Sequence, residues 1–311
     1  MLSVPRLNTL REVARRESIS AAAQALDYTQ SAVSQQVAAL EREAKTPLLE
    51  RHGRGVRLTA AGQTLVAHAD GIIARLQAAE DALGAIAGLR GGRLRLATFS
   101  SAGAALIPRA IARFSAEHPL VELSLVEGEP EDLVPRLRAG ELDLAVLFEF
   151  GESQSLGELQ RTDLFDDPLF LALPAEHPLA ARTAVPLAAL SDDAWVQTSL
   201  GSPCAQQVVR SCHAAGFAPR VAFESDDYET VQGLVAAGMG VALIPRLALA
   251  SGVQRDVAIR AVAPDPLTRR VFALAPAGSR LIPAAPAMVA VLESLSASGR
   301  PADLPDAPSR Y

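Results

Sequence analysis

The pattern of apolar and polar positions along the first 60 residues predicts three short helices. Leu7, Leu10 and Val13 recur at helical spacing, and Val33 and Val37 repeat that spacing further along. Hydroxyl side chains stand directly before the second and third apolar runs, where an N-terminal helix cap is favoured. The expected helices cover residues 7–17, 21–26 and 30–44, with Ser20 and Thr29 as the caps of the last two.

The polar side of the third expected helix has a composition suited to nucleic acid. Its side chains are short, uncharged and rich in amides and hydroxyls, which can bond base edges in the major groove. A solvated polar face on an ordinary helical bundle explains the same pattern, so this helix alone leaves both interpretations open. The residues on this side are Gln30, Ser31, Ser34 and Gln35.

The segment that follows predicts a basic hairpin. Residues 48–58 read as two short strands around a glycine-containing turn, and they carry Arg51, Arg54 and Arg57. Arginines on such a hairpin can contact phosphates or the minor groove while a neighbouring helix reads bases. A basic hairpin beside a polar helix is typical of a winged helix-turn-helix.

A long helix is predicted next, from Thr59 to about Leu89, because this stretch has no proline. Its apolar residues alternate by three and four, as in a helix that pairs with a second copy. An amphipathic helix lying against its own domain is the alternative. A two-fold dimer would favour a roughly palindromic DNA site. The apolar positions are Leu65, Ala69, Ile72, Leu76, Ala79, Leu83 and Ile86.

Beyond Gly92, strand-like and helix-like segments alternate, which predicts a parallel α/β sheet. A first group is followed by a second that starts near Asp163, and the chain then returns to the first group after Pro283. Two lobes with crossing strands are therefore expected. The expected strands are 93–98, 120–126, 142–148, 169–173, 194–198, 220–223, 240–244 and 269–275, and the main helices are 104–116, 130–139 and 203–215.

Charge is distributed unevenly. The chain of 311 residues has a net charge of -6, yet its first 60 residues hold nine basic and six acidic side chains, against 20 and 29 in the remainder. A basic end on an acidic body fits a protein that attracts phosphate with one part only. With 49% hydrophobic and 21% charged residues, the chain has the composition of folded domains rather than of disorder.

Five sequence blocks in order resemble the N-terminal signature of LysR-type transcriptional regulators. Leu49 stands where this family usually has Phe, and the dipeptide at 27–28 falls at a variable position; neither departure breaks the order of the blocks. The blocks are SAAAQAL at 20–26, TQSAVSQQV at 29–37, LE at 40–41, PLLER at 47–51 and LTAAG at 58–62.

The resemblance extends over nearly the whole chain and implies a multidomain protein. It implies a mainly helical winged helix-turn-helix at the N-terminus, a linker helix for dimerisation, and a two-lobed α/β domain like a periplasmic binding protein that takes an effector. The corresponding ranges are 1–58, 59–91 and 92–299, with lobe I at 92–162 and 268–299, lobe II at 163–267, and a flexible tail at 300–311.

The partners expected on this basis are double-stranded promoter DNA, a small-molecule effector and further copies of the chain. The family resemblance adds assembly into tetramers and makes RNA polymerase a candidate partner. No cofactor, metal or membrane is expected, and the place of action is the cytoplasm. The candidate DNA-contacting residues are Ser20, Thr29, Gln30, Ser31, Ser34, Gln35, Gln36, Arg51, Arg54 and Arg57.

An effector is expected beyond the carboxyl ends of the strands, where helix N-termini offer unpaired N–H groups. Hydroxyls with free amides suit a carboxylate or a similar anion, although plain helix capping explains several of these serines. Glu149 would repel an anion and would instead meet an amine or solvent. The candidate effector-binding residues are Ser100, Ser101, Gly128, Glu149, Thr198, Ser199 and Ser202.

The sequence is less consistent with three other functions. Cys204 and Cys212 invite a redox-responsive regulator, but eight residues along one helix separate them by about 12 Å, too far for a bridge unless the helix unwinds. A solute-binding protein would need a secretion signal in place of the basic N-terminus. An enzyme would need a nucleophile elbow or phosphate-binding loop, and the sequence shows neither, so catalysis is not expected.

Overall fold

The computed structural model describes residues 2–52, 55–86, 92–151, 157, 159–276 and 284–298. The chain divides into two compact units. The first comprises Met1–Gly92 with Pro135–Asp143, and the second comprises Arg93–Val134 with Leu144–Tyr311.

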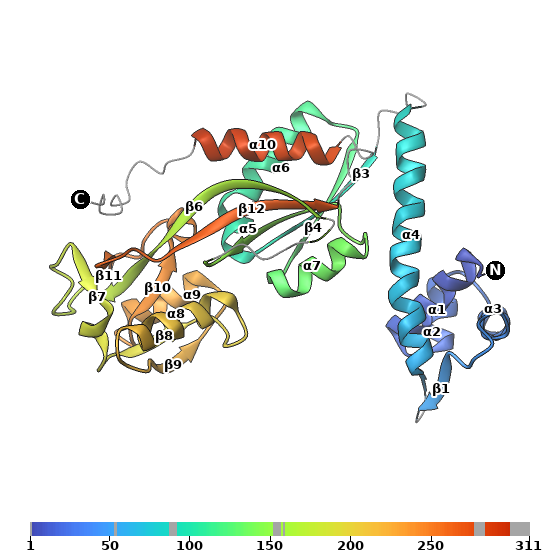
Figure 1. Ribbon diagram of the computed structural model, residues 1–311, viewed down its shortest axis with the longest axis horizontal. Helices are drawn as coiled ribbons and strands as arrows, with labels where there is room; N and C mark the ends of the chain where they lie inside the picture. Colours follow the sequence, from blue (N-terminus) through green and yellow to red (C-terminus); the bar gives the residue numbers. More distant parts are fainter. Residues whose placement is uncertain are drawn as a thin grey trace. The chain divides into compact units, whose positions relative to one another are not determined.

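The first unit contains the predicted three helices and hairpin (Figure 1). Its core joins Leu7 and Leu10 of the first helix to Leu40 of the third and to Leu48 before the hairpin, all of them almost fully buried. Leu7 and Leu10 are positions that the apolar periodicity of the first helix selects. The elements are α1 Val4–Arg16, α2 Ile19–Ala25, α3 Gln30–Ala44, β1 Leu49–His52, β2 Gly55–Leu58 and α4 Ala60–Ile86.

The ends of these helices confirm one predicted cap and correct another. Thr29 caps α3, since its Oγ1 accepts a hydrogen bond from the Ala32 amide at 3.2 Å. The cap of α2 is Ser18 rather than Ser20, because Ser18 has the extended backbone of a cap and its Oγ accepts from the Ala21 amide at 3.3 Å. The prediction placed this helix start two residues too late.

Helix α4 packs against its own unit over its first turns and leaves apolar side chains exposed further along. Thr59 caps it by accepting from the Gly62 amide at 3.1 Å, while the Thr59 hydroxyl donates to the carbonyl of Pro47 at 2.8 Å. Its first turns pack into the core of their own unit, where Ala69 is fully buried. Further along, Ile72 and Leu76 are 42% and 46% exposed, so an apolar stripe is left uncovered on this part of the helix.

The second unit is built on one large mixed sheet rather than on the predicted parallel sheet. Its strand order is β4-β3-β5-β12-β6-β11-β7, with β10 also paired to β6. These strands are β3 Gly92–Thr98, β4 Val121–Glu127, β5 Leu144–Glu149, β6 Leu159–Pro174, β7 Ala184–Pro186, β10 Ala242–Pro245, β11 Val257–Ala263 and β12 Thr268–Pro276. Strands β3 and β5 are parallel, but β12 runs antiparallel to both β5 and β6. The sequence pattern missed this because β12 reaches its partners from more than 100 residues away.

Strand β6, Leu159–Pro174, connects the two lobes (Figure 1). Its first half pairs with β12, and its second half pairs with β10 and β11. The prediction covered only 169–173, because the first half is less apolar and lacks the buried run of the second. One continuous strand therefore carries the sheet from lobe I into lobe II.

The remaining elements follow the prediction with two further corrections. The single helix expected at 104–116 is two helices, α5 and α6, which meet at Leu106, and strands β7 and β11 were not foreseen. The elements, with β6 given above, are β3 Gly92–Thr98, α5 Ser100–Ala105, α6 Ile107–Glu117, β4 Val121–Glu127, α7 Pro130–Arg138, β5 Leu144–Glu149, β7 Ala184–Pro186, η1 Leu187–Leu190, β8 Ala194–Gln197, α8 Pro203–Ala214, β9 Arg220–Glu224, α9 Tyr228–Ala236, β10 Ala242–Pro245, η2 Arg246–Leu249, β11 Val257–Ala263, β12 Thr268–Pro276 and α10 Ala284–Ser298.

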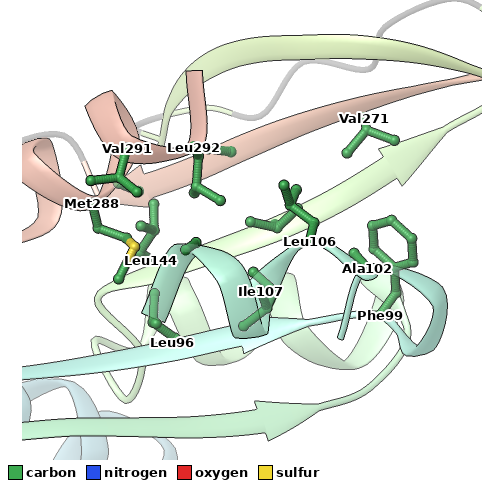
Figure 2. Close-up of a cluster of buried hydrophobic side chains, with 14 of the residues drawn as sticks. Leu96, Phe99, Ala102, Leu106, Ile107, Leu144, Val271, Met288, Val291 and Leu292 are labelled. Carbon is green, nitrogen blue, oxygen red and sulfur yellow. The ribbon is translucent and has the colours of Figure 1, made fainter. Parts of the chain in front are cut away.

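The core of lobe I forms where α6 and α10 pack together and against the sheet. Figure 2 shows Met288 and Leu292 of α10 in one cluster with Leu144 of β5 and Ile107 of α6. Since α10 follows β12 at the far end of the sequence, this packing ties the end of the described chain back into the first lobe.

The core of lobe II lies on both faces of the second half of β6. Leu171 and Leu173 belong to a cluster that includes Val208 of α8, whereas Phe170 belongs to a cluster that includes Val231 of α9. Because successive side chains of a strand point to opposite faces, this segment is apolar at every position. Helices α8 and α9 are thereby fixed on opposite sides, with their N-terminal ends available to build a site.

Candidate functional site

Helix α3 presents the polar surface that the sequence predicted. Gln30, Ser31, Ser34 and Gln35 are exposed, while Val33 on the other side of the helix is fully buried. The capping hydroxyl of Thr29 lies 3.0 Å from that of Ser31. Burial of one side therefore fixes which side chains remain free to meet a nucleic-acid groove.

Two of the candidate residues near α3 are engaged within the protein. The amide oxygen of Gln36 accepts a hydrogen bond from the buried Thr9 hydroxyl at 2.6 Å, and Gln36 is only partly exposed. Ser20 lies on α2, with its Oγ 3.1 Å from that of Ser18. The Gln36 contact links α3 to α1, whereas the Ser20 contact stays within the first turn of α2.

The hairpin that follows α3 in the sequence carries the basic residues. Arg57 of β2 forms an exposed ion pair with Glu50 of β1, with 3.0 Å between Nη2 and Oε1. Arg51 lies on β1, but its side chain is outside the described part of the structure. Arg54 lies outside the described residues altogether.

A small cavity in the second unit brings four of the predicted effector residues together. Ser100, Ser101, Thr198 and Ser202 all line it, two from lobe I and two from lobe II. Its volume of about 20 Å³ is room for about one water molecule. The other lining residues are Phe99, Glu129, Phe148, Cys204, Asp226, Tyr228 and Arg269.

The serine and threonine side chains divide between capping and cavity roles. Ser202 caps α8, accepting from the Ala205 amide at 3.1 Å, and its Oγ lies 2.5 Å from that of Thr198. Ser100 and Ser101 instead form the first turn of α5, whose cap position is Phe99. Capping thus explains Ser202 but not the two serines of lobe I.

Three predicted effector residues lie outside the cavity lining. Glu149 is paired with Arg161 and Arg270, at 2.7 Å and 2.8 Å. Ser199 donates from its backbone amide and its hydroxyl to the Asp226 carboxylate, at 2.9 Å and 2.6 Å. Gly128 immediately precedes Glu129 in the sequence.

Arg269 occupies the centre of this region and is 1% exposed. Its Nε and Nη2 reach Oδ2 of the fully buried Asp167 at 3.0 Å and 2.9 Å. Nη2 also donates to the Ser101 hydroxyl at 2.6 Å, and Nη1 donates to Cys204 Sγ at 3.6 Å. Burial by itself lowers the pKa of Arg269, but the adjacent Asp167 carboxylate raises it overall, so the guanidinium stays charged.

Aromatic rings enclose the same guanidinium. Its central carbon lies 4.7 Å from the ring centres of both Phe99 and Phe148. Asp167 in turn accepts a hydrogen bond from the Leu247 amide at 2.9 Å. The pair therefore joins β12 and β6 to α5 of lobe I and to α8 and η2 of lobe II.

Glu129 differs from Asp167, because one of its carboxylate oxygens lacks a hydrogen-bond donor. Its Oε2 is buried without a hydrogen-bond partner in the described part of the structure. Burial, followed by repulsion from Glu131 and Asp226, raises the pKa of this carboxyl to about 7. A buried carboxylate oxygen without a donor is costly, so Glu129 is a natural point of contact for a ligand.

The two cysteines are both buried thiols. Burial raises the pKa of Cys204, although the neighbouring Arg269 lowers it in part, and burial raises that of Cys212 to about 11. Within the described ranges, no group of three His, Cys, Asp or Glu side chains is placed to hold a metal ion. No described helix is long and apolar enough to cross a membrane.

Sequence reasoning missed Glu129, Asp226, Tyr228 and Arg269 as lining residues. Glu129 and Asp226 each lie three residues after the end of a predicted strand, and Glu129 directly follows the candidate residue Gly128. Arg269 sits at the start of a strongly apolar strand, and a charged residue in such a place signals a buried partner. Its partner, Asp167, lies 102 residues earlier and could not be assigned from the pattern alone.

Comparison with protein families gives two matches. Residues 5–63 match the bacterial regulatory helix-turn-helix of the lysR family, and residues 87–296 match the LysR substrate binding domain. The first range contains the exposed face of α3 and the hairpin, and the second contains the cavity around Arg269.

Several characterised proteins are similar over most of their length. The transcriptional dual regulator GltC of Bacillus subtilis is 31% identical, with 91% of this chain and 94% of that protein covered. The dual regulator OxyR of Escherichia coli is 30% identical, with 88% of both covered. The RuBisCO operon transcriptional regulator of Acidithiobacillus ferrooxidans is 31% identical, with 94% of both covered.

Solved structures share the fold. A full-length OxyR variant from Pseudomonas aeruginosa superposes with a TM-score of 0.71 at 24% identity, covering 95% of both chains. Full-length CbnR in complex with its target DNA gives a TM-score of 0.68 at 21% identity, covering 94% of this chain and all of the other. At this level of identity the likeness concerns the fold alone.

Proposed function

The chain belongs to the LysR family of DNA-binding transcriptional regulators, and from this premise we propose how its two units divide the work. Helix α3 reads base edges in promoter DNA while the hairpin contacts the backbone. The second unit binds a small molecule between its lobes, and binding changes how strongly the protein engages its promoter.

The exposed face of α3 carries the DNA-binding part of the proposal. Gln30 and Gln35 can each bond adenine through two atoms, and Ser31 and Ser34 can bond several bases. Gln36 and Thr29 position this surface through their contacts within the protein. Arg57, together with Arg51 and Arg54, supplies phosphate or minor-groove contacts, which fix the register.

Helix α4 is proposed as the dimerisation element over 59–91. The exposed Ile72 and Leu76 leave an apolar stripe that a second copy of the helix would cover. A dimer places two winged helices on a site with two-fold symmetry, with half-sites one helical turn or a multiple apart. Association into a tetramer and contact with RNA polymerase extend this arrangement on the basis of the family.

The cavity at 92–299 is proposed as the effector site, formed between lobe I at 92–162 with 268–299 and lobe II at 163–267. Its support is the convergence of hydroxyls from both lobes with one buried Arg269. A ligand held from both sides can favour a closed over an open arrangement of the lobes. The protein acts in the cytoplasm, where promoter DNA lies, and has no catalytic role.

The direct test is a footprint and mobility-shift assay on the DNA upstream of its own gene at several salt concentrations. Gln35→Ala should weaken binding and relax the preference for one base, because it removes a contact to a base edge. Arg57→Ala should weaken binding to all sequences about equally and reduce the salt slope by about 1. Absence of sequence-preferring binding there and across the genome would exclude the proposal.

A redox-responsive regulator using Cys204 and Cys212 is a second candidate. Its support is that Cys204 lines the cavity and contacts Arg269, and that relatives include a hydrogen peroxide-inducible genes activator, 30% identical over 88% of both chains. Against it, burial keeps both thiols protonated. Both lie on α8, with about 12 Å of helix between them against at most about 7 Å between the Cα atoms of a disulfide.

Peroxide treatment separates the two candidates. A disulfide would form when both thiols lose a proton and an electron to peroxide, which is reduced to water. Peroxide-dependent loss of two free thiols, together with altered DNA binding that Cys204→Ser abolishes, would establish the redox mechanism. Unchanged thiol content and DNA binding would leave the small-molecule mechanism.

A further inference from the structure

The charge balance of the effector cavity differs from the one expected for a carboxylate ligand. Among the described residues that line it, Arg269 is the single basic side chain. All three of its nitrogens already have partners, and Asp167 neutralises its charge. An incoming anion would therefore meet a guanidinium that is already paired and enclosed by aromatic rings.

The cavity wall carries two carboxylates that do not belong to the buried pair of Arg269 and Asp167. Glu129 follows strand β4 in lobe I, and Asp226 precedes helix α9 in lobe II. Asp226 accepts two hydrogen bonds from Ser199, whereas Oε2 of Glu129 is buried without a donor. The cavity thus offers an unsatisfied acceptor beside a second negative charge, a combination that suits a cation with N–H groups.

We infer that the effector carries a protonated amine, which docks against Glu129 and Asp226 between the lobes. This rests on the proposed function of the second unit as an effector domain. The ammonium donates to the free oxygen of Glu129, and its charge offsets the repulsion between the two carboxylates. Because these groups belong to different lobes, the amine draws the lobes together.

The hydroxyls around the cavity fit the rest of such a molecule. Ser100 and Tyr228 come from opposite lobes, and the paired hydroxyls of Thr198 and Ser202 add further donors and acceptors. The room present, about 20 Å³, accommodates the ammonium group itself. A larger effector would need more room than this, and therefore a wider separation of the lobes that β6 connects.

The test uses the full chain and sets of small molecules matched in size but not in charge. One set is ethanolamine, ethylene glycol and glycolate, and the other is 1,4-diaminobutane, 1,4-butanediol and succinate. Thermal unfolding is followed at pH 8 and constant ionic strength by the fluorescence of Trp195, the one tryptophan of the chain, which is fully buried in lobe II. At this pH Glu129 is ionised, because its pKa is about 7.

The amines should raise the Tm by about 3–6 °C at ten times the half-saturating concentration, while the diols and the acids should not. The shift should vanish in Glu129→Gln and persist in Glu122→Gln. The latter is the same change at an exposed residue of β4 that does not line the cavity. Circular dichroism establishes that both variants fold.

Three outcomes would overturn the inference: stabilisation by glycolate or succinate alone, an equal amine shift in Glu129→Gln, or no shift with either amine. Promoter binding by the same wild-type preparation keeps this result separate from the proposed function. If DNA binding is intact and the amines fail, only the effector chemistry is wrong. If DNA binding fails, the regulator function falls whatever the amines do.

Discussion

At the scale of single residues, the second unit holds two acidic groups in opposite situations. Asp167 is fully buried and satisfied by Arg269 and by the Leu247 amide. Glu129 is partly buried and has an oxygen without a donor. The first therefore stabilises the folded state, and the second is held at a cost that a ligand can relieve.

Glu129 should make stability fall as pH rises. Its pKa is raised from 4.5 to about 7 in the folded protein, so between these values the folded state keeps a proton that the unfolded state has lost. The stabilisation is complete below about pH 4.5 and is lost as pH rises through 7.

Glu129→Gln should remove this loss. Urea unfolding followed by Trp195 fluorescence should show that the free energy of unfolding of the variant rises relative to that of the wild type between pH 5 and pH 8. The gain should be on the order of 1 kcal/mol, after allowance for solvent screening of this partly exposed group. A constant difference across that range would contradict the assignment.

Asp167→Asn should destabilise the second unit strongly. It leaves the buried Arg269 charge without its partner, which costs about 3–5 kcal/mol. The double change Asp167→Asn with Arg269→Met removes both charges and should recover much of that loss. Urea unfolding of the full chain measures both, and equal losses in the single and double variants would argue against this role of the pair.

At the scale of elements, helix ends and close packing define the N-terminal unit. Ser18 rather than Ser20 caps α2, and Gly62 allows α4 to approach the hairpin, because a Cβ at this position would overlap the carbonyl oxygen of Leu48. Thr59 adds a hydrogen bond to Pro47 at the same junction. These contacts fix α4 against the domain before its apolar stripe emerges.

The two serines of α2 give a matched pair of substitutions. Ser18→Ala should destabilise the helix by about 1 kcal/mol, since it removes the acceptor for the Ala21 amide. Ser20→Ala should change stability by less than about 0.5 kcal/mol. Hydrogen exchange of the α2 amides in the full chain measures both, and a larger effect at Ser20 would show that the cap is misassigned.

At the scale of the whole molecule, the proposed function depends on how many winged helices one assembly presents. A single copy binds one half-site, whereas a dimer binds two at once and gains from the high effective concentration of the second. We propose the exposed stripe on α4 as the surface that makes that dimer.

Ile72→Asp combined with Leu76→Asp should dissociate the dimer. Two charges on the stripe would have to be buried unpaired if α4 associated with a second copy. Sedimentation velocity should show a smaller species, and DNA affinity should fall by more than tenfold. Gln63→Asp puts one such charge on an exposed position about 180° around α4 from Ile72 and should leave the assembly intact.

Local patterns determined the elements whose stability comes from neighbours in sequence. Helix α3 begins and ends as predicted, because its buried Val33 and Val37 lie within the 15-residue helix and its cap Thr29 directly precedes it. The exposed polar residues and the uncovered stripe of α4 follow from the same periodicity. The family resemblance rested on these segments too, since its blocks lie within the first 62 residues.

Only the tertiary structure decided the order of the sheet and the chemistry of the cavity. The antiparallel place of β12, the contact of Arg269 with Asp167 across 102 residues, and its contact with Ser101 across 168 all depend on how distant strands pair. Pairing between distant segments is set by global packing, on which a local period of apolar residues carries no information. For the same reason, the sequence suggested an anion for a site whose remaining charges favour an amine.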